Sequence, residues 1–303
     1  MSDVPEAVPL LAVDGLSVTF GRAGASPAVR DIAFTLSSGE RWGLIGESGS
    51  GKSATALAIM GLLPEGVHVH GSVRWRGGEL VGLGDAAYSR LRGDAMTMVF
   101  QEPMTALDPT MTVGRQVAEV LRLHYVRRAA DAQRYGVGPE RIRGHARERV
   151  LGVLAEVGLP DVERIADSFP HQLSGGQRQL VLIGMALMNS PLLVICDEPT
   201  TALDVTVQAT VLRLLDAGLS AVGAACLFIS HDLAVVSQVC SQVMVMYQGR
   251  IVERGSLAQV LGAPAHPYTR GLVATAAIDA VPPGERLPVI GDFWAGEDGG
   301  RDG

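Results

Sequence analysis

Apolar and polar residues alternate through much of the first 40 positions of the chain. Residues 10–21 and 28–40 both follow this period of two and end in glycine-containing turns, which predicts two antiparallel strands. Residues 41–46 then form a short, mostly apolar run that leads into a glycine-rich loop, and residues 52–63 have the spacing and composition of a helix. The pattern therefore predicts a strand, a loop and a helix in direct succession.

The remainder of the chain switches between helical periodicity and continuous apolar runs. A helical pattern extends from Val113 to about Gly158, and another helix is predicted between a small-residue turn at 173–176 and Pro191. Residues 192–196 and 224–229 are continuous apolar runs followed by polar residues, as in strands buried on both faces of a parallel sheet. Strands and helices alternating in this order predict an α/β domain with a largely parallel sheet.

The composition excludes several classes of protein. Of the 303 residues, 47% are hydrophobic, which is enough for a sizeable buried core. The formal net charge is −7 and neither end carries a polybasic run, so we expect no nucleic-acid partner, because non-specific binding of that kind depends on neutralising phosphates. The arginines that cluster between Arg122 and Arg149 are expected to cover a solvated helical face. The three cysteines, Cys196, Cys226 and Cys240, are too widely spaced to indicate a zinc site or a disulfide framework.

The N-terminus and the apolar runs predict a protein that stays in the cytoplasm. Asp3 and Glu6 stand where a secretory signal peptide carries positive charge. The longest apolar runs, 180–188 and 221–229, are about nine residues each, well short of the roughly 20 needed to cross a bilayer. If this chain works at a membrane, another subunit must therefore span it.

The segment GESGSGKS, residues 46–53, contains Lys52, the only lysine in the chain. It matches G-x-x-x-x-G-K-[ST] and lies between a predicted strand and a predicted helix, the context in which a phosphate-binding loop occurs. Glycines let backbone N–H groups surround an anion, and the helix N-terminus adds the positive end of its dipole. The compact ammonium group of Lys52 would reach the β- and γ-phosphates of a nucleotide. The wide, rigid guanidinium group of an arginine is not interchangeable with it. The hydroxyl of Ser53 would bind Mg²⁺.

Two carboxylates complete a candidate hydrolytic site. Asp197 and Glu198 follow the buried strand predicted over 192–196. Asp197, at the mouth of that strand, could hold the magnesium shell, and Glu198 could orient and deprotonate a water molecule. Phosphoryl transfer depends on positioning and charge neutralisation more than on covalent chemistry, and these groups supply both.

The phosphate loop, LSGGQ at 173–177 and LLVICDEP at 192–199 occur together in an order and spacing that resemble those of ATP-binding cassette (ABC) proteins, the motor subunits of ABC transporters. The resemblance covers roughly residues 10–275. It implies an α/β ATP-binding cassette fold, with a P-loop NTPase core on a mostly parallel sheet, an antiparallel β subdomain and a helical subdomain.

The resemblance also implies a domain organisation. A cassette domain is expected over residues 1–262, with the helical subdomain inserted at about 102–175. A family-specific tail is expected over 263–303, and its last ten or so residues are expected to be disordered because they are polar and glycine-rich.

The same resemblance implies roles for single residues. Gln101 resembles the Q-loop glutamine, which touches both the metal site and the transmembrane partner, and His231 resembles the switch histidine that contacts the γ-phosphate. Phe20 stands where the family places an aromatic ring that stacks on adenine, with a core position as the alternative. The implied cofactors are ATP and Mg²⁺, with Glu198, His231 and Gln101 as catalytic residues and Ser53, Gln101 and Asp197 at the metal. The residues implied to bind the nucleotide are Phe20, Gly46, Glu47, Ser48, Gly49, Ser50, Gly51, Lys52, Ser53, Ser174, Gly175, Gly176, Gln177 and Asp204.

The segments LSGGQ and TALD imply a two-subunit site. In the family the LSGGQ loop of one subunit closes over ATP bound to the other, so Ser174 and Gly176 would complete the site of a second cassette, in a homodimer or a heterodimer. TALD, residues 201–204, resembles the family's D-loop. A monomer is therefore expected to hydrolyse ATP poorly.

HPYTRGL at 266–272, with QEPMTALDP and EPTTALDVTVQ, resembles the ATPases of oligopeptide, dipeptide and nickel importers. This resemblance implies a peripheral protein on the cytoplasmic face of the cell membrane, beneath two transmembrane permease subunits and an extracytoplasmic substrate-binding protein. Di- or oligopeptides are the favoured cargo. Nickel or a metallophore is the alternative, because the tail lacks the cysteine-containing segment of many peptide importers.

Two other functions are possible for a chain with these cassette motifs, besides that of an importer subunit. A soluble ABC ATPase with no transport role is the distant alternative, and its usual marks are a coiled-coil insertion, zinc-binding cysteines or a second cassette. The sequence shows none of these marks. A cassette that binds ATP without hydrolysing it is disfavoured, because every catalytic position of the family is filled.

Overall fold

The computed structural model describes residues 8–21, 25–101, 106–132, 139–201, 203–276 and 293, and within these ranges it leaves the side chains of 124–132 and 139–145 undescribed. The chain divides into two compact units. The first comprises residues 1–37, 41–82 and 227–303, and the second comprises 38–40 and 83–226. The last ten residues, for which disorder was expected, lie outside the described residues.

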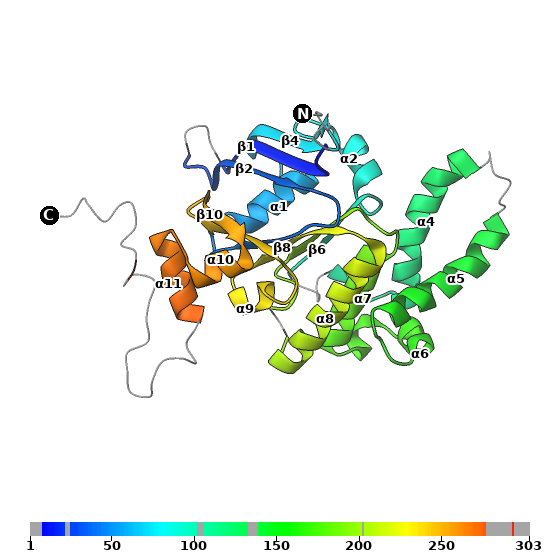
Figure 1. The fold of residues 1–303 in the computed structure, drawn as a ribbon. Coiled ribbons are helices and arrows are strands. Elements are labelled where there is room, and N and C mark those ends of the chain that lie inside the picture. The colour runs from blue at the N-terminus through cyan, green and yellow to red at the C-terminus, as the bar shows by residue number, and fades with distance from the viewer. Residues whose placement is uncertain are drawn as a thin grey trace, which may run out of the picture. The chain divides into compact units, whose positions relative to one another are not determined.

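The first unit contains two groups of strands, of which β1, β2, β4 and β10 are labelled in Figure 1. One is an antiparallel sheet with the order β2-β1-β4-β5, in which Leu11 of β1 pairs with Leu36 of β2 and Trp75 of β4. In the other group β9 pairs antiparallel with β10 and parallel with β3. The strands are β1 (Leu11–Thr19), β2 (Val29–Leu36), β3 (Arg41–Ile45), β4 (His68–Trp75), β5 (Gly78–Glu79), β9 (Gln242–Tyr247) and β10 (Arg250–Ser256). The antiparallel pair predicted over 10–21 and 28–40 is thus confirmed as β1 and β2.

Four helices of the first unit are described: α1 (Lys52–Met60), α9 (Leu233–Val236), α10 (Leu257–Gly262) and α11 (Pro267–Ala276). The predicted succession of strand, loop and helix is confirmed, since β3 ends at Ile45 and α1 begins at Lys52. Gly61 ends α1 in the left-handed conformation, with φ 61°, and its N–H donates to the carbonyl of Ala58. A left-handed glycine after the last turn is a common way to end a helix, so α1 has a defined length.

The second unit combines short parallel strands with a group of helices. β6 pairs in parallel with β7, bringing Val99 opposite Cys196, and every residue of β7 is buried, as predicted for a strand covered on both faces. Helices α4 and α5 lie side by side in this unit (Figure 1). Its described elements are α2 (Asp85–Leu91), β6 (Met96–Val99), α4 (Val113–Ala132), α5 (Pro139–Glu156), α6 (Val162–Asp167), a 3-10 turn (Pro170–Gln172), α7 (Gly175–Leu187), β7 (Leu193–Asp197) and α8 (Val205–Val222). β8 (Ala225–Ser230) begins in the second unit and ends in the first.

The helix predicted to run up to Pro191 ends earlier than expected. α7 ends at Leu187, and Ser190 adopts a left-handed conformation with φ 51°. The Asn189 side chain donates from Nδ2 to the carbonyl of Gly93 at 2.7 Å. Asn189 is therefore held by a residue outside the helix, and the chain turns toward β7 before the proline.

Among the described residues, α8 is the one helix long and apolar enough to cross a membrane by length and composition alone. It carries Arg213 and Asp216 within its length, and it buries Val211, Leu215 and Leu219. α8 also packs against α7 within the second unit. Charged residues on one face and buried leucines on another are the pattern of a helix packed onto a domain.

Candidate functional site

The candidate residues divide between the two units. Those in the first unit are Phe20, the phosphate loop at 46–53 and His231. Those in the second unit are Gln101, the LSGGQ loop at 173–177, Asp197, Glu198 and Asp204.

The phosphate loop requires glycine at two positions because other backbone lies against it. A Cβ on Gly46 would come within 2.1 Å of the Met246 carbonyl oxygen, and one on Gly51 within 2.5 Å of the Ala28 carbonyl oxygen. Gly51 also has a left-handed φ of 107° as it starts α1. The loop can therefore adopt this path only with glycine at both positions.

Lys52, the first residue of α1, lies inside this loop. The residue is 4% exposed, and its ammonium group donates to the carbonyl oxygens of Gly46 and Glu47 at 2.7 and 2.9 Å. A buried ammonium needs such oxygen partners. These contacts hold the only lysine of the chain against the loop in which it is expected to bind phosphate.

Further polar groups of the loop fit a phosphate and a metal ion. Ser50 is 5% exposed, and its hydroxyl has no hydrogen-bond partner among the described residues. An unpartnered buried hydroxyl is costly, and a phosphate oxygen is a suitable acceptor for it. Ser53, one residue into α1, is exposed, so its hydroxyl can reach a cation beside the phosphate. The residues present therefore fit the nucleotide and the Mg²⁺ that the sequence predicts.

Asp197 and Glu198 stand at the end of the buried strand β7. Asp197 is 6% exposed, and Glu198 has a left-handed backbone with φ 47°, which costs a residue with a side chain roughly 1–2 kcal/mol. The Glu198 carboxylate oxygen Oε2 accepts hydrogen bonds from Gln101 Nε2 at 3.2 Å and from Thr201 Oγ1 at 3.0 Å. The second unit thus brings Gln101 and Glu198 together, at a strained backbone position of the kind found at functional sites.

Thr201 is a contact that the sequence analysis missed, because it placed this residue only within the D-loop segment. Its hydroxyl also lies 3.3 Å from the Glu198 carbonyl oxygen. The signal was present in the spacing, since a hydroxyl three residues after a strand-end carboxylate can turn back to it.

The LSGGQ loop forms the N-terminal cap of α7. The Ser174 hydroxyl accepts from the Gln177 N–H at 3.3 Å, and the Gln177 side chain accepts from the Ser174 N–H at 3.0 Å, which is a capping box. A Cβ on Gly176 would lie 2.4 Å from Val207, at the start of α8, so the two segments pack closely. Asp204 caps α8 by accepting from the Val207 N–H at 3.0 Å. The structure therefore uses Asp204 as a helix cap.

Phe20 and His231 stand at strand ends in the first unit. Phe20 follows β1 and is 43% exposed, so its ring is not a core residue. His231 follows β8 and is exposed. Both side chains can therefore face a ligand.

Tyr268, on α11, contacts the phosphate loop. The sequence analysis did not predict this contact. The Tyr268 hydroxyl accepts a hydrogen bond from the Glu47 N–H at 3.0 Å. The segment HPYTRGL was noted only as a mark of the importer subfamily. The 221 residues that separate Tyr268 from Glu47 leave no local pattern that would have revealed the contact.

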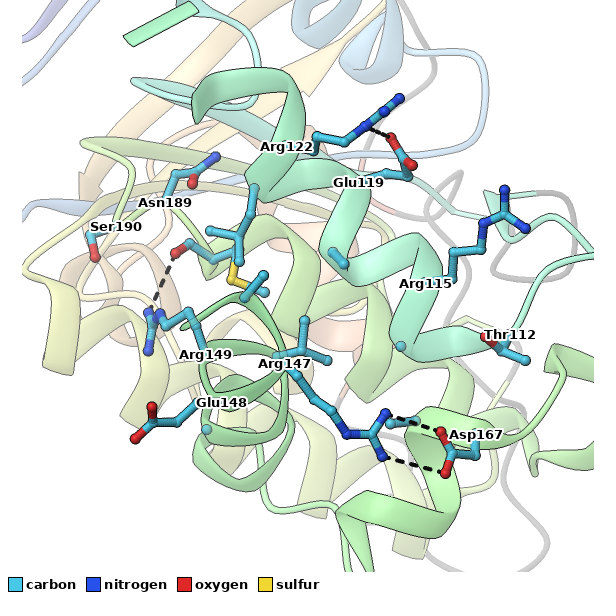
Figure 2. Close-up of a pocket in the computed structure, with 18 residues that line it drawn as sticks. Thr112, Arg115, Glu119, Arg122, Arg147, Glu148, Arg149, Asp167, Asn189 and Ser190 are labelled. Carbon is cyan, nitrogen blue, oxygen red and sulfur yellow. Dashed lines mark hydrogen bonds and ion pairs between the residues drawn. The ribbon is translucent and has the colours of Figure 1, made fainter. Parts of the chain in front are cut away.

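A pocket of about 1100 Å³ in the second unit lies beside α4 and α5 (Figure 2). Figure 2 shows Arg147 and Asp167 pointing toward each other, at 3.3 Å, and Arg149 donating to the carbonyl of Met188. Both sides of the Arg147–Asp167 pair are exposed, so it contributes little to stability. Arg122, Arg147 and Arg149 line this pocket, and the side chains of the other arginines in the cluster lie outside the described ones, so the solvated helical face expected for the cluster stays a prediction.

The fold and these motifs define a class of protein, and comparison with known proteins identifies it. A family model described as "ABC transporter" matches residues 29–201. The chain belongs to the ABC transporter family. Among solved structures, the dimeric ATP-binding cassette MJ0796 bound to ADP and Pi matches with a TM-score of 0.68 and 26% identity, over 82% of this chain and 98% of that one.

Curated relatives narrow the resemblance to peptide transport. The oligopeptide transport ATP-binding protein OppD of Mycobacterium tuberculosis is 46% identical over 286 residues, which cover 93% of this chain and 44% of that protein. OppD of Haemophilus influenzae is 44% identical over 277 residues, 90% of this chain and 79% of that protein. The chain spans less than half the length of the first of these relatives.

Proposed function

We propose that this chain binds ATP and Mg²⁺ and hydrolyses ATP as the energising subunit of a peptide importer. The observation that carries the proposal is the phosphate loop, in which glycines stand against backbone carbonyls and the only lysine is buried against two loop oxygens. Family membership and the names of the relatives support the same function.

The phosphate loop is assigned to the β- and γ-phosphates. Lys52, held against the Gly46 and Glu47 carbonyls, would reach the phosphate oxygens when ATP enters, and the buried Ser50 hydroxyl would gain an acceptor. The N–H groups at the start of α1 add the positive end of the helix dipole. Phe20 is assigned to the adenine ring, because its exposed ring can stack on a base.

Glu198 is assigned as the base of hydrolysis. It would take a proton from the water that attacks the γ-phosphorus, while the bond from the γ-phosphorus to the oxygen of the β-phosphate breaks and ADP leaves. Gln101 and Thr201 fix the orientation of its carboxylate through hydrogen bonds to Oε2. Ser53, Gln101 and Asp197 are assigned to Mg²⁺, which would neutralise phosphate charge, and His231 is assigned to the γ-phosphate.

A second cassette is proposed to complete the site. The capping box at Ser174 pairs the N–H groups of Ser174 and Gln177, and Ser174 and Gly175 are exposed at the start of α7, where the helix N-terminus can meet a phosphate of the partner subunit. We assign Ser174 and Gly176, with Gly175 between them, to that contact. Two transmembrane permease subunits and an extracytoplasmic substrate-binding protein are the remaining proposed partners, and they would hold this chain at the cytoplasmic face of the membrane.

Peptides are the proposed cargo because the relatives named above are oligopeptide transport proteins. Nickel or a metallophore remains the alternative suggested by the cysteine-free tail. The ATPase rate of the assembled transporter distinguishes the two assignments. It is measured with the binding protein and either a mixed peptide pool or Ni²⁺. Stimulation by Ni²⁺ alone would overturn the peptide assignment.

Glu198→Gln tests the hydrolytic role within the assembled complex. The amide keeps the size of the side chain but cannot take a proton, so we expect ATP binding to remain and turnover to fall by about 100-fold or more. Glu163→Gln, on the exposed face of α6, is the matched control and should retain full activity. Unchanged ATP hydrolysis in the Glu198→Gln complex would overturn the assignment. Failure of the chain to co-purify with any membrane subunit would instead favour a soluble ABC ATPase.

A further inference from the structure

The segment HPYTRGL is fixed to β10 by one carboxylate. Glu253 accepts hydrogen bonds from the N–H groups of Ala265 and His266, both at 2.8 Å. Burial opposes ionisation of this group, but these hydrogen bonds hold the pKa of the Glu253 carboxyl below its ordinary value. The loop before α11 is therefore tied to the sheet by a charge-assisted contact.

The start of α11 is set by the same segment. His266 Nδ1 accepts from the N–H of Tyr268 at 3.2 Å, which satisfies one of the backbone donors left unpaired at a helix N-terminus. The Arg270 side chain donates to the carbonyl of Ala265 at 3.2 Å. Together these contacts fix the direction in which Tyr268 leaves the helix.

Tyr268 is fully buried, with 0% of the residue exposed. Its ring lies against that of Tyr247, with the ring centres 4.4 Å apart and the planes tilted by 40°. Burial raises the pKa of Tyr268 to about 12, so its hydroxyl stays neutral throughout the physiological range. A rigid, neutral hydroxyl is therefore presented to the Glu47 N–H at 3.0 Å.

The N–H of Glu47 and the carbonyl of Gly46 belong to one planar peptide group. Tyr268 accepts from the N–H end of this group, and the Lys52 ammonium donates to its carbonyl end at 2.7 Å. Rotation of the peptide plane would break both contacts together. The hydroxyl on α11 therefore fixes the orientation of the carbonyl on which Lys52 rests.

We propose that Tyr268 is a positioning residue for nucleotide binding, through which α11 and the tail segment HPYTRGL hold the phosphate loop in its binding conformation. The inference rests on the proposed function, because it assigns α11 a part in ATP affinity. Without the hydroxyl, the Gly46–Glu47 peptide samples other orientations, and the apparent Kd for ATP rises in inverse proportion to the binding-competent fraction that remains.

Tyr268→Phe removes the hydroxyl and keeps the buried ring. In the full chain we expect the Kd for MgATP to rise by about 3- to 10-fold, the range for one lost hydrogen bond, while kcat at saturating ATP in the assembled transporter stays within about twofold. Tyr247→Phe is the matched control, since it removes a neighbouring hydroxyl that is bonded to the Gln248 side chain. That variant should bind MgATP as the unaltered chain does.

Amide hydrogen exchange gives a readout that a general loss of stability would not reproduce. Exchange at the Glu47 N–H should quicken in Tyr268→Phe and stay unchanged in Tyr247→Phe. A folded Tyr268→Phe chain with unaltered MgATP affinity and unaltered exchange at Glu47 would overturn the inference and leave α11 with a packing role only.

The unaltered chain supplies a second measurement if Tyr268→Phe does not fold. Saturating MgATP should slow amide exchange across residues 267–276, and no change there would overturn the inference. If the unaltered chain does not bind MgATP at all, the proposed function fails as well. A different outcome separates the two proposals. If the unaltered chain binds MgATP, Lys52→Ala does not, and amide exchange in α11 does not change with MgATP, the inference about Tyr268 is wrong while the proposed function stands.

Discussion

Raising the pH from 9 to 12 should weaken the fold through the buried hydroxyl of Tyr268. The folded chain holds the pKa of this group at about 12, against an ordinary value of 10.0. Between these values the unfolded chain has released its proton and the folded chain has not, so stability falls as the pH rises. Below pH 10 both states are protonated, and the hydroxyl makes no pH-dependent contribution.

The size of the effect follows from the two pKa values. Each unit of pKa difference corresponds to about 1.4 kcal/mol, so complete titration would cost the fold about 2.7 kcal/mol. At pH 11, midway through the range, the loss is about half of that, roughly 1.4 kcal/mol. A difference of this size is readily measured in a small domain, where it is a considerable share of the total free energy of unfolding.

Urea denaturation of the unaltered chain and of Tyr268→Phe, at pH 9 and pH 11, isolates this contribution. The other tyrosines titrate in both proteins, so they cancel when the two are compared. The stability advantage of the unaltered chain should shrink by about 1.3 kcal/mol between the two pH values. An advantage that stays constant over this range would show that Tyr268 titrates as it does in the unfolded chain, and would refute the reasoning from burial.

Three substitutions test other parts of the structure. Gly46→Ala places a Cβ 2.1 Å from the Met246 carbonyl, so MgATP affinity should fall by more than about tenfold, and near-normal binding by calorimetry would show that the loop can move aside. Gly43→Ala places a Cβ 2.3 Å from the Val236 side chain and should cost about 1–3 kcal/mol in urea denaturation. Adding Val236→Ala should recover part of that loss, and strictly additive costs would contradict the clash. Ser174→Ala removes the cap of α7 and should lower the free energy of unfolding by about 1 kcal/mol. An unchanged midpoint of urea denaturation would show that the cap does not stabilise the fold.

The phosphate loop and the buried strands were predictable because their signals are local. The glycines and Lys52 fall within eight residues, and the apolar runs that became β7 and β8 need no partner to be recognised. The resemblance to a known family then supplied roles for residues that carry no local signal, such as Gln101. The cassette fold followed from the same set of motifs.

The contacts that could not be predicted join residues that are distant in sequence. Gln101 and Glu198 are 97 residues apart, and only the fold brings the amide to the carboxylate. The strained backbone of Glu198 was also invisible, because a glutamate gives no sign that it will adopt a left-handed conformation. The early end of α7 depends in the same way on Asn189 reaching the carbonyl of Gly93.

The burial of Lys52 gives the chain a built-in chemical reporter. Because it is the only lysine, an amine-selective acylating reagent has one side-chain target, and that target is 4% exposed and held by two carbonyl oxygens. The rate of acylation at this site therefore measures how often the phosphate loop opens. Mass spectrometry of the peptide that contains Lys52, which separates this site from the α-amine of the chain, can follow that opening without any engineered label.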